Sequence, residues 1–166
     1  MKEEIKQFLT YLLVEKGFSE NTLSAYQNDL SQLVSFIEEE AAKSGKMPSW
    51  SGFNRQTMLA YQLSLKERNY AATTLARKIA AAKSFFKFMV TEGKVSENPT
   101  QNVASPNVGR ILPKPITLKQ VRALLDQPAK QSTPEAKRDR AMLELLYASG
   151  MRVSELISLN IGDIDI

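Results

Sequence analysis

Apolar residues recur three and four positions apart through most of the chain, which is the spacing of one buried face on an α-helix. Before residue 97 this pattern predicts four helices, at about 2–16, 20–43, 55–68 and 72–92. Gly17 and Gly93 follow two of them as C-terminal caps, and Asn54 precedes the third as an N-cap. We therefore expect residues 1–97 to fold as one four-helix domain. Its predicted core consists of Leu23, Leu30, Leu33, Met58, Tyr61, Leu75, Ile79 and Phe86.

Four prolines, at positions 99, 106, 113 and 115, interrupt the helical pattern. Proline lacks the backbone N–H that a helix needs, and the accompanying Asn, Ser and Gly residues favour extended or turn conformations. The segment 98–116 is therefore predicted to be an extended linker between two domains.

Helical spacing resumes after the linker. Thr117 and Gln120 have the spacing of a capping box, and Thr133 precedes a proline at the start of a helix that runs to about residue 147. After a break at 149–151 a short helix begins at Arg152, and residues 161–166 alternate like the beginning of a strand. A lone strand is not a stable end to a domain. We therefore expect residues 117–166 to be the N-terminal fragment of a larger domain.

Composition excludes several kinds of chemistry. The chain contains no cysteine and no histidine, so thiolate ligands, disulfides and imidazole catalysis are absent from these residues. The seven glycines are spaced too widely for a Gly-rich phosphate loop or a dinucleotide-binding fingerprint. There is no apolar run of the length that spans a bilayer and no signal-like segment at the start. We expect a cytoplasmic protein with no metal, no cofactor and no membrane contact.

Charge is distributed unevenly within the net +4 of the chain. Residues 1–48 hold five basic and eight acidic side chains, residues 49–107 hold eight and three, and residues 108–166 hold nine and seven. The basic central third indicates a polyanionic partner, although such an excess is also common on a solvated surface.

Two of the predicted helices have outer faces suited to a DNA groove. Opposite its apolar stripe, helix 20–43 presents neutral polar residues that both donate and accept hydrogen bonds. Helix 72–92 presents small residues, which permit a close approach, and basic residues, which bind phosphates. A solvated face would have a similar pattern. The candidate DNA contacts are Asn21, Thr22, Ser24, Asn28, Thr73, Thr74, Arg77, Lys78, Ser84 and Lys87.

Residues 149–156 have the order Ser-Gly-Met-Arg-Val-Ser-Glu-Leu. This order resembles the first signature of the tyrosine recombinase (phage integrase) family. Residues 19–26 resemble the opening of the second helix of that family's core-binding domain, and 76–78 with 85–88 resemble its fourth helix. Residues 97–99 resemble the entrance of the interdomain linker. The resemblance covers nearly the whole chain in the right order, and within the family it is to the Xer-type recombinases.

The resemblance implies both a fold and a function. The fold is all-α, with a four-helix core-binding (SAM-like) domain, an extended linker, and the helical beginning of an α+β catalytic domain that ends in one incomplete strand. The family recombines double-stranded DNA through a 3′-phosphotyrosine intermediate, without a cofactor. The full-length parent would act as a tetramer on paired DNA sites. The 166 residues alone would be a monomer or a dimer through their last strand.

The resemblance assigns one catalytic residue, Arg152, whose guanidinium would bind the scissile phosphate. Glu155 matches the family's acidic position and would orient other groups rather than carry a proton. The family's remaining catalytic groups match no residue here, so we expect this chain alone to bind DNA without cutting it. Two other interpretations stay open: a natural short module that occupies recombination sites without catalysis, and a helical protein–protein adaptor.

Overall fold

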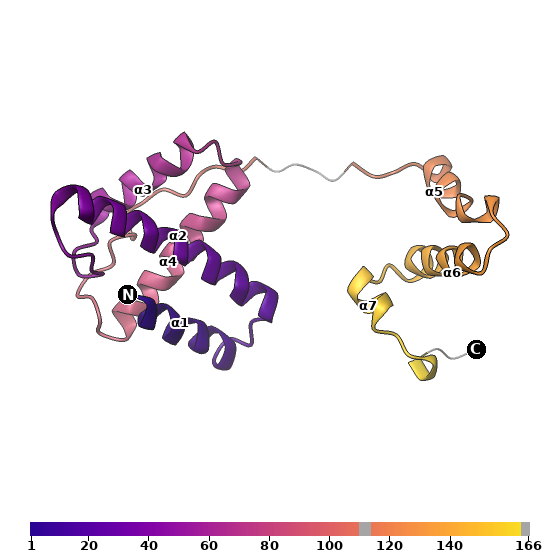
Figure 1. Ribbon diagram of the computed structural model, residues 1–166, viewed down its shortest axis with the longest axis horizontal. Coiled ribbons are helices and arrows are strands. Elements are labelled where there is room, and N and C mark those ends of the chain that lie inside the picture. Colours follow the sequence, from indigo (N-terminus) through magenta and orange to yellow (C-terminus); the bar gives the residue numbers. More distant parts are fainter. Residues whose placement is uncertain (110–113, 164–166) are drawn as a thin grey trace. The chain divides into compact units, whose positions relative to one another are not determined.

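The computed structural model describes residues 1–109 and 114–163 (Figure 1). All regular secondary structure in these ranges is helical, which confirms the all-α prediction, and none of these helices has the length and apolarity that crossing a membrane requires. The chain divides into two units, Met1–Arg110 and Ile111–Ile166. The helices of the first unit are α1 (Lys2–Val14), α2 (Glu20–Ser44), α3 (Arg55–Glu67) and α4 (Ala72–Thr91).

The ends of these helices follow from local chemistry. The Ser19 hydroxyl accepts a hydrogen bond from the Thr22 backbone N–H at 3.4 Å, and the Asn54 side chain accepts one from Thr57 at 3.1 Å. These bonds satisfy N–H groups that have no partner in the first turn of a helix. Gly45 ends α2 with φ at 63°, a left-handed conformation that glycine adopts without steric strain.

Helices α1 to α4 enclose one apolar core, and α4 packs against the other three (Figure 1). Seven of the eight predicted core residues are buried, and Leu23 is half-buried at the edge of the core. The largest fully buried side chains are Tyr61, Phe8, Phe85, Phe86, Leu30, Leu33, Met58, Leu65, Ile79 and Met89.

The loop between α2 and α3 completes this core with two aromatic residues. The Trp50 ring centroid lies 4.7 Å from that of Phe85 and 5.6 Å from that of Phe86, and Phe53 stacks on Phe86 at 4.7 Å. The Trp50 indole N–H donates to the Met1 carbonyl at 3.3 Å. Helical periodicity did not reveal these contributions because the loop has no helical period.

The first part of the predicted linker packs on the first unit instead of extending away from it. Thr100 and Val103 are buried, with 1% and 3% exposure, and the Gln62 side chain donates to the Ala104 carbonyl at 3.0 Å. Proline prevents helix formation, but it does not prevent neighbouring side chains from being buried. Residues 98–104 therefore pack on the first unit, and the division into two domains joined by a linker stays a prediction.

In the second unit the predicted caps are present. The Thr117 hydroxyl accepts from the Gln120 N–H at 3.3 Å, and the Gln120 side chain accepts from the Thr117 N–H at 2.8 Å. The Thr133 hydroxyl accepts from the Ala136 N–H at 3.2 Å. The elements of this unit are α5 (Leu118–Leu125), the 3-10 turn η1 (Pro128–Lys130), α6 (Pro134–Ser149), α7 (Val153–Ile157) and the 3-10 turn η2 (Ile161–Asp163).

The predicted strand does not begin at residue 161. Ile161–Asp163 form the turn η2, in which the Asp163 carboxylate accepts the Asn160 N–H at 2.8 Å. The Asp163 N–H also donates to the Asn160 carbonyl at 3.0 Å, so a donor that a strand would direct to a neighbouring strand is satisfied within the turn. Residues 164–166, with the rest of the predicted strand and its dimer contact, lie outside the described residues.

Phe86→Ala should lower the free energy of unfolding by about 3–5 kcal/mol, because it removes a fully buried ring with three aromatic neighbours. Urea denaturation followed by Trp50 fluorescence measures this change. Leu63→Ala is the control: this side chain is 59% exposed on α3, so we expect a change of less than about 0.5 kcal/mol. Equal effects of the two substitutions would contradict the described core.

Candidate nucleic-acid interface

The outer faces of α2 and α4 lie side by side and enclose a groove of about 420 Å³. Short side chains at Ala25, Ala80 and Ala81 leave this hollow between the two helices. Asn21 from one predicted face and Arg77 from the other therefore line a single groove. Its full lining is Asn21, Thr22, Ala25, Tyr26, Asp29, Arg77, Ala80 and Ala81.

The predicted DNA contacts differ in exposure. Six side chains are exposed: Asn21, Ser24, Asn28, Thr73, Arg77 and Lys87. Three are half-buried: Thr22, Thr74 and Ser84. The Thr22 hydroxyl lies 3.0 Å from the Ser19 hydroxyl and so takes part in the N-cap of α2. Contact of these residues with DNA stays a prediction.

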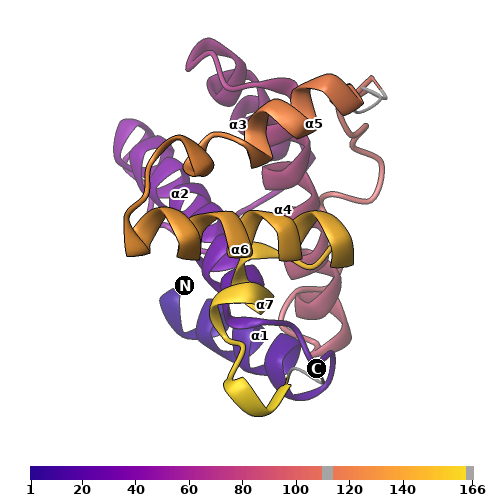
Figure 2. The same cartoon turned by 90° about the vertical axis from the view of Figure 1, so that its right-hand side faces the viewer.

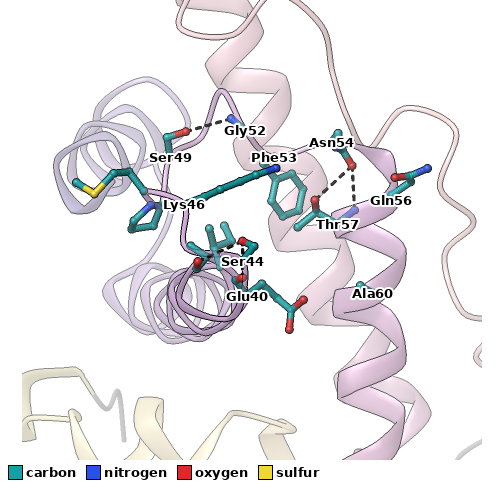
Figure 3. Close-up of a pocket in the computed structure, with 14 residues that line it drawn as sticks. Glu40, Ser44, Lys46, Ser49, Gly52, Phe53, Asn54, Gln56, Thr57 and Ala60 are labelled. Carbon is teal, nitrogen blue, oxygen red and sulfur yellow. Dashed lines mark hydrogen bonds between the residues drawn. The ribbon is translucent and has the colours of Figure 1, made fainter.

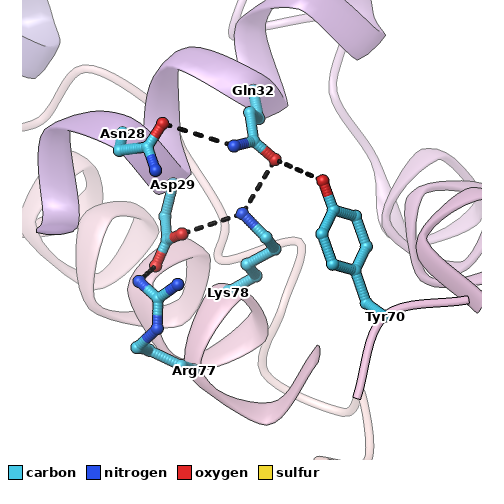
Figure 4. A network of polar contacts seen from close by, with 6 residues as sticks. All are labelled: Asn28, Asp29, Gln32, Tyr70, Arg77 and Lys78. Carbon is cyan, nitrogen blue, oxygen red and sulfur yellow. Dashed lines mark hydrogen bonds and ion pairs between the residues drawn. The ribbon is translucent and has the colours of Figure 1, made fainter. Parts of the chain in front are cut away.

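Lys78 is a correction to the predicted set, because its side chain turns inward. It is only 3% exposed, and its ammonium donates to the Asp29 carboxylate at 2.9 Å and to the Gln32 side chain at 2.8 Å (Figure 4). The ammonium also lies 5.2 Å from the centre of the Tyr70 ring. An ammonium has three donors, and here two oxygens and an aromatic face surround it. Lys78 therefore cannot reach a DNA phosphate in this arrangement.

Arg77 pairs with the same carboxylate but stays at the surface. Its Nη1 donates to Asp29, while 48% of the side chain is exposed at the groove. Asp29, which is 2% exposed, thus holds two cations, one buried and one exposed. Sequence reasoning missed Asp29, since no spacing rule shows that position 29 of one helix meets positions 77 and 78 of another.

The same network orients two side-chain amides. The Lys78 ammonium can only donate, so the Gln32 atom beside it is the carbonyl oxygen, which also accepts from the Tyr70 hydroxyl at 3.4 Å. The Gln32 amide nitrogen then donates to the Asn28 carbonyl oxygen at 3.3 Å (Figure 4). The amide group that Asn28 can offer to a ligand is therefore its NH₂, a donor suited to phosphate oxygens and to acceptors on base edges.

A further cavity of about 370 Å³ lies at the other end of α2, beside the start of α3 (Figure 3). Polar groups around it serve local structure: Asn54 caps α3, and the Ser49 hydroxyl accepts the Gly52 N–H at 3.1 Å. None of the predicted DNA contacts lines this cavity. Its residues therefore belong to the fold rather than to the candidate interface.

In the second unit, Arg152 precedes α7 and its side chain is 82% exposed. The Glu155 carboxylate accepts the Arg152 backbone N–H at 2.7 Å and the guanidinium Nη1 at 2.8 Å. Both bonds lower the pKa of Glu155 below its ordinary value, and the backbone bond has the larger effect. Glu155 thus holds Arg152 by both its backbone and its side chain.

Two stretches of the chain match known families. Residues 5–93 match the family described as phage integrase, N-terminal SAM-like domain, and residues 114–166 match the phage integrase family. The chain belongs to the tyrosine recombinase (phage integrase) family. This membership confirms the resemblance, and it covers both units.

Individual tyrosine recombinases are similar along the whole chain. Tyrosine recombinase XerC of Herpetosiphon aurantiacus is 49% identical over 100% of this chain and 53% of its own length. Tyrosine recombinase XerC of Roseiflexus castenholzii is 43% identical over 100% of this chain and 51% of its own. Tyrosine recombinase XerD of Halalkalibacterium halodurans is 40% identical over 99% of this chain and 53% of its own. The chain thus spans about half the length of these relatives.

Among solved structures, the integrase from mycobacterium phage Brujita aligns with 91% of this chain and 46% of its own. The two are 20% identical, with a TM-score of 0.48.

A ¹³C titration of the Glu155 carboxyl should give a pKa below the ordinary value of 4.5. Because the pKa of Glu155 is lowered in the folded chain, its bond to Arg152 stabilises α7 fully at a pH above the ordinary pKa. This stabilisation is lost as the pH falls through the lowered pKa. Arg152→Ala should raise the pKa only part of the way, since the backbone N–H, the larger cause, remains. Arg138→Ala, which removes an exposed arginine from α6, should leave the Glu155 pKa unchanged. A complete return to 4.5 in Arg152→Ala would show that the backbone bond is absent.

Proposed function

We propose that this chain is the DNA-binding portion of a site-specific tyrosine recombinase that acts on double-stranded DNA. The observation that carries the proposal is the α2–α4 groove, where an amide and a guanidinium from two helices line one hollow. These are the groups that bind phosphate oxygens and base edges in DNA complexes. The groove lies in the unit that matches the integrase SAM-like domain, and the central third of the chain carries the largest basic excess.

In this proposal the duplex lies along the exposed sides of α2 and α4. Arg77 and Lys87 are ten positions apart on α4, which separates them by about 15 Å along the helix axis. They would therefore neutralise different phosphates. Asn21, Ser24 and Asn28 would supply uncharged hydrogen bonds along α2. Thr22, Thr73, Thr74 and Ser84 complete the proposed interface at its edges.

The proposed reaction of the full-length protein follows the chemistry of its family. A tyrosine hydroxyl attacks the scissile phosphorus, the bond from phosphorus to the 5′ oxygen breaks, and a 3′-phosphotyrosine link forms. The 5′-hydroxyl of a partner strand then attacks this link, restores the DNA backbone and releases the tyrosine. Arg152 would bind the non-bridging oxygens, whose charge grows in the transition state. We propose that the parent protein acts as a tetramer on paired sites, without metal or cofactor.

Arg152 is suited to this role by its exposure and by Glu155. Nη1 of its guanidinium binds Glu155. An arginine has five N–H donors, so this one bond leaves others for a phosphate. Arg152 alone would not cut DNA, because catalytic groups that act together lose nearly all activity when most are missing.

Arg77→Ala and Lys87→Ala should each weaken binding to a short duplex built on a recombination site of the related proteins. Each should make the slope of log affinity against log salt shallower by about 0.9, the amount expected for one phosphate contact. Lys43→Ala is the matched control: it removes an exposed lysine at the far end of α2, which is paired with Glu40, and should leave the slope unchanged. Unchanged affinity and slope in both test variants would place the DNA on another surface. Absence of any salt-dependent DNA binding would favour the protein–protein adaptor.

The 166-residue chain should form no covalent adduct with a nicked suicide substrate, in which loss of a short strand traps the phosphotyrosine link. The five tyrosines lie at 11, 26, 61, 70 and 147, and none has the sequence context of the family's nucleophile. Tyr61 is buried, and burial raises its pKa, which disfavours the reactive phenolate. The full-length XerC of Herpetosiphon aurantiacus provides the positive control. An adduct formed by the 166 residues alone would overturn this assignment of roles.

A further inference from the structure

The α2–α4 interface contains one carboxylate and two cations. Asp29 is 2% exposed, and the Lys78 ammonium, on a residue with 3% exposure, lies 2.9 Å from its Oδ1. The Arg77 guanidinium binds the other carboxylate oxygen, Oδ2, from the surface (Figure 4). The three side chains together carry a net charge of +1.

The two cations differ in what else they can bind. The Lys78 ammonium is enclosed by Asp29, the Gln32 oxygen and the Tyr70 ring, so its charge interacts only with these interior groups. A buried carboxylate needs a cation or several hydrogen bonds, and Lys78 provides that cation without help from the surface. The charge of Arg77 is therefore in excess of what the interior requires, and it stands at the groove.

We propose that Lys78 is a positioning residue for DNA binding: by neutralising Asp29 inside the protein, it leaves the positive charge of Arg77 available to a phosphate. Asp29 in turn orients the Arg77 guanidinium at the groove through Nη1. Without the charge of Lys78, Asp29 would depend on Arg77 alone, and the pair would be neutral. This inference rests on the proposed DNA-binding function of the α2–α4 groove.

Lys78→Met tests the proposal, since it removes a charge that has no access to DNA. A cation that is already neutralised by a carboxylate releases few counterions when it meets a phosphate. We expect the salt slope of duplex binding to become shallower by about 0.9, as far as in Arg77→Ala, although Lys78 is buried.

The double variant Asp29→Asn/Lys78→Met separates charge from packing. It removes both buried charges, a change that proteins tolerate better than the loss of one partner. Arg77 would then be free of any carboxylate, so the slope should return to that of the unchanged chain. A merely structural role of Lys78 predicts no such return, because the double variant lacks the Lys78 side chain as well.

All variants are compared in the 166-residue chain, with urea denaturation to establish that each is folded. Lys78→Gln, which removes the charge but keeps a donor for Asp29, takes the place of Lys78→Met if the latter does not fold. Lys43→Met, which removes an exposed lysine, is the matched control and should leave the slope unchanged.

Three outcomes distinguish the two proposals. If Arg77→Ala leaves the slope unchanged, the DNA-binding surface is misplaced, and the role of Lys78 falls with it. If Arg77→Ala makes the slope shallower, the inference is overturned by a folded Lys78 variant with an unchanged slope. It is also overturned by a double variant whose slope stays as shallow as that of Lys78→Met.

Discussion

The packing of α4 against α2 determines where every candidate DNA contact of the first unit lies. Both helices place an apolar stripe in the common core, with Leu30 on α2 and Ile79 on α4 fully buried. At 100° per residue, Arg77 lies about 160° around α4 from Ile79, so burying one exposes the other. The groove between the helices exists because alanines occupy α4 where the two outer faces meet.

We interpret the buried ion pair within this contact as a source of specificity rather than of stability. Removing two charges from water offsets much of the attraction between them. Each nevertheless requires its partner at one place, and Gln32 and Tyr70 add directional bonds to the same ammonium. We interpret the network as selecting one register of α4 on α2. That register is the one in which Arg77 reaches the groove.

The two arginines singled out by their chemistry are held in different ways. Arg152 is oriented by Glu155, three positions along the chain, so a single helical turn is sufficient to produce its geometry. Arg77 is oriented by Asp29, which is 48 positions away, and depends on the fold of the whole first unit. The signature around Arg152 is therefore visible as a short motif, whereas the surroundings of Arg77 are not.

Local interactions account for what the sequence by itself determined. Helix positions and the caps at Asn54, Thr117 and Thr133 depend on neighbours within four positions, and they were predicted. Helical spacing also identified seven residues that are buried in the apolar core, but not the aromatic residues of the loop between α2 and α3. The family motif around Arg152 has the same local character, since its residues adjoin one another in the chain.

Only the tertiary structure decided which polar residues are buried. Lys78 follows Arg77 directly, and both are charged residues of a type usually found on the surface. The packing of α2 nevertheless encloses Lys78 and leaves Arg77 exposed. Thr100 and Val103 likewise pack on the first unit although their proline-rich segment indicates a linker. Burial depends on residues far away in the chain, and periodicity within one helix or one loop carries no information about them.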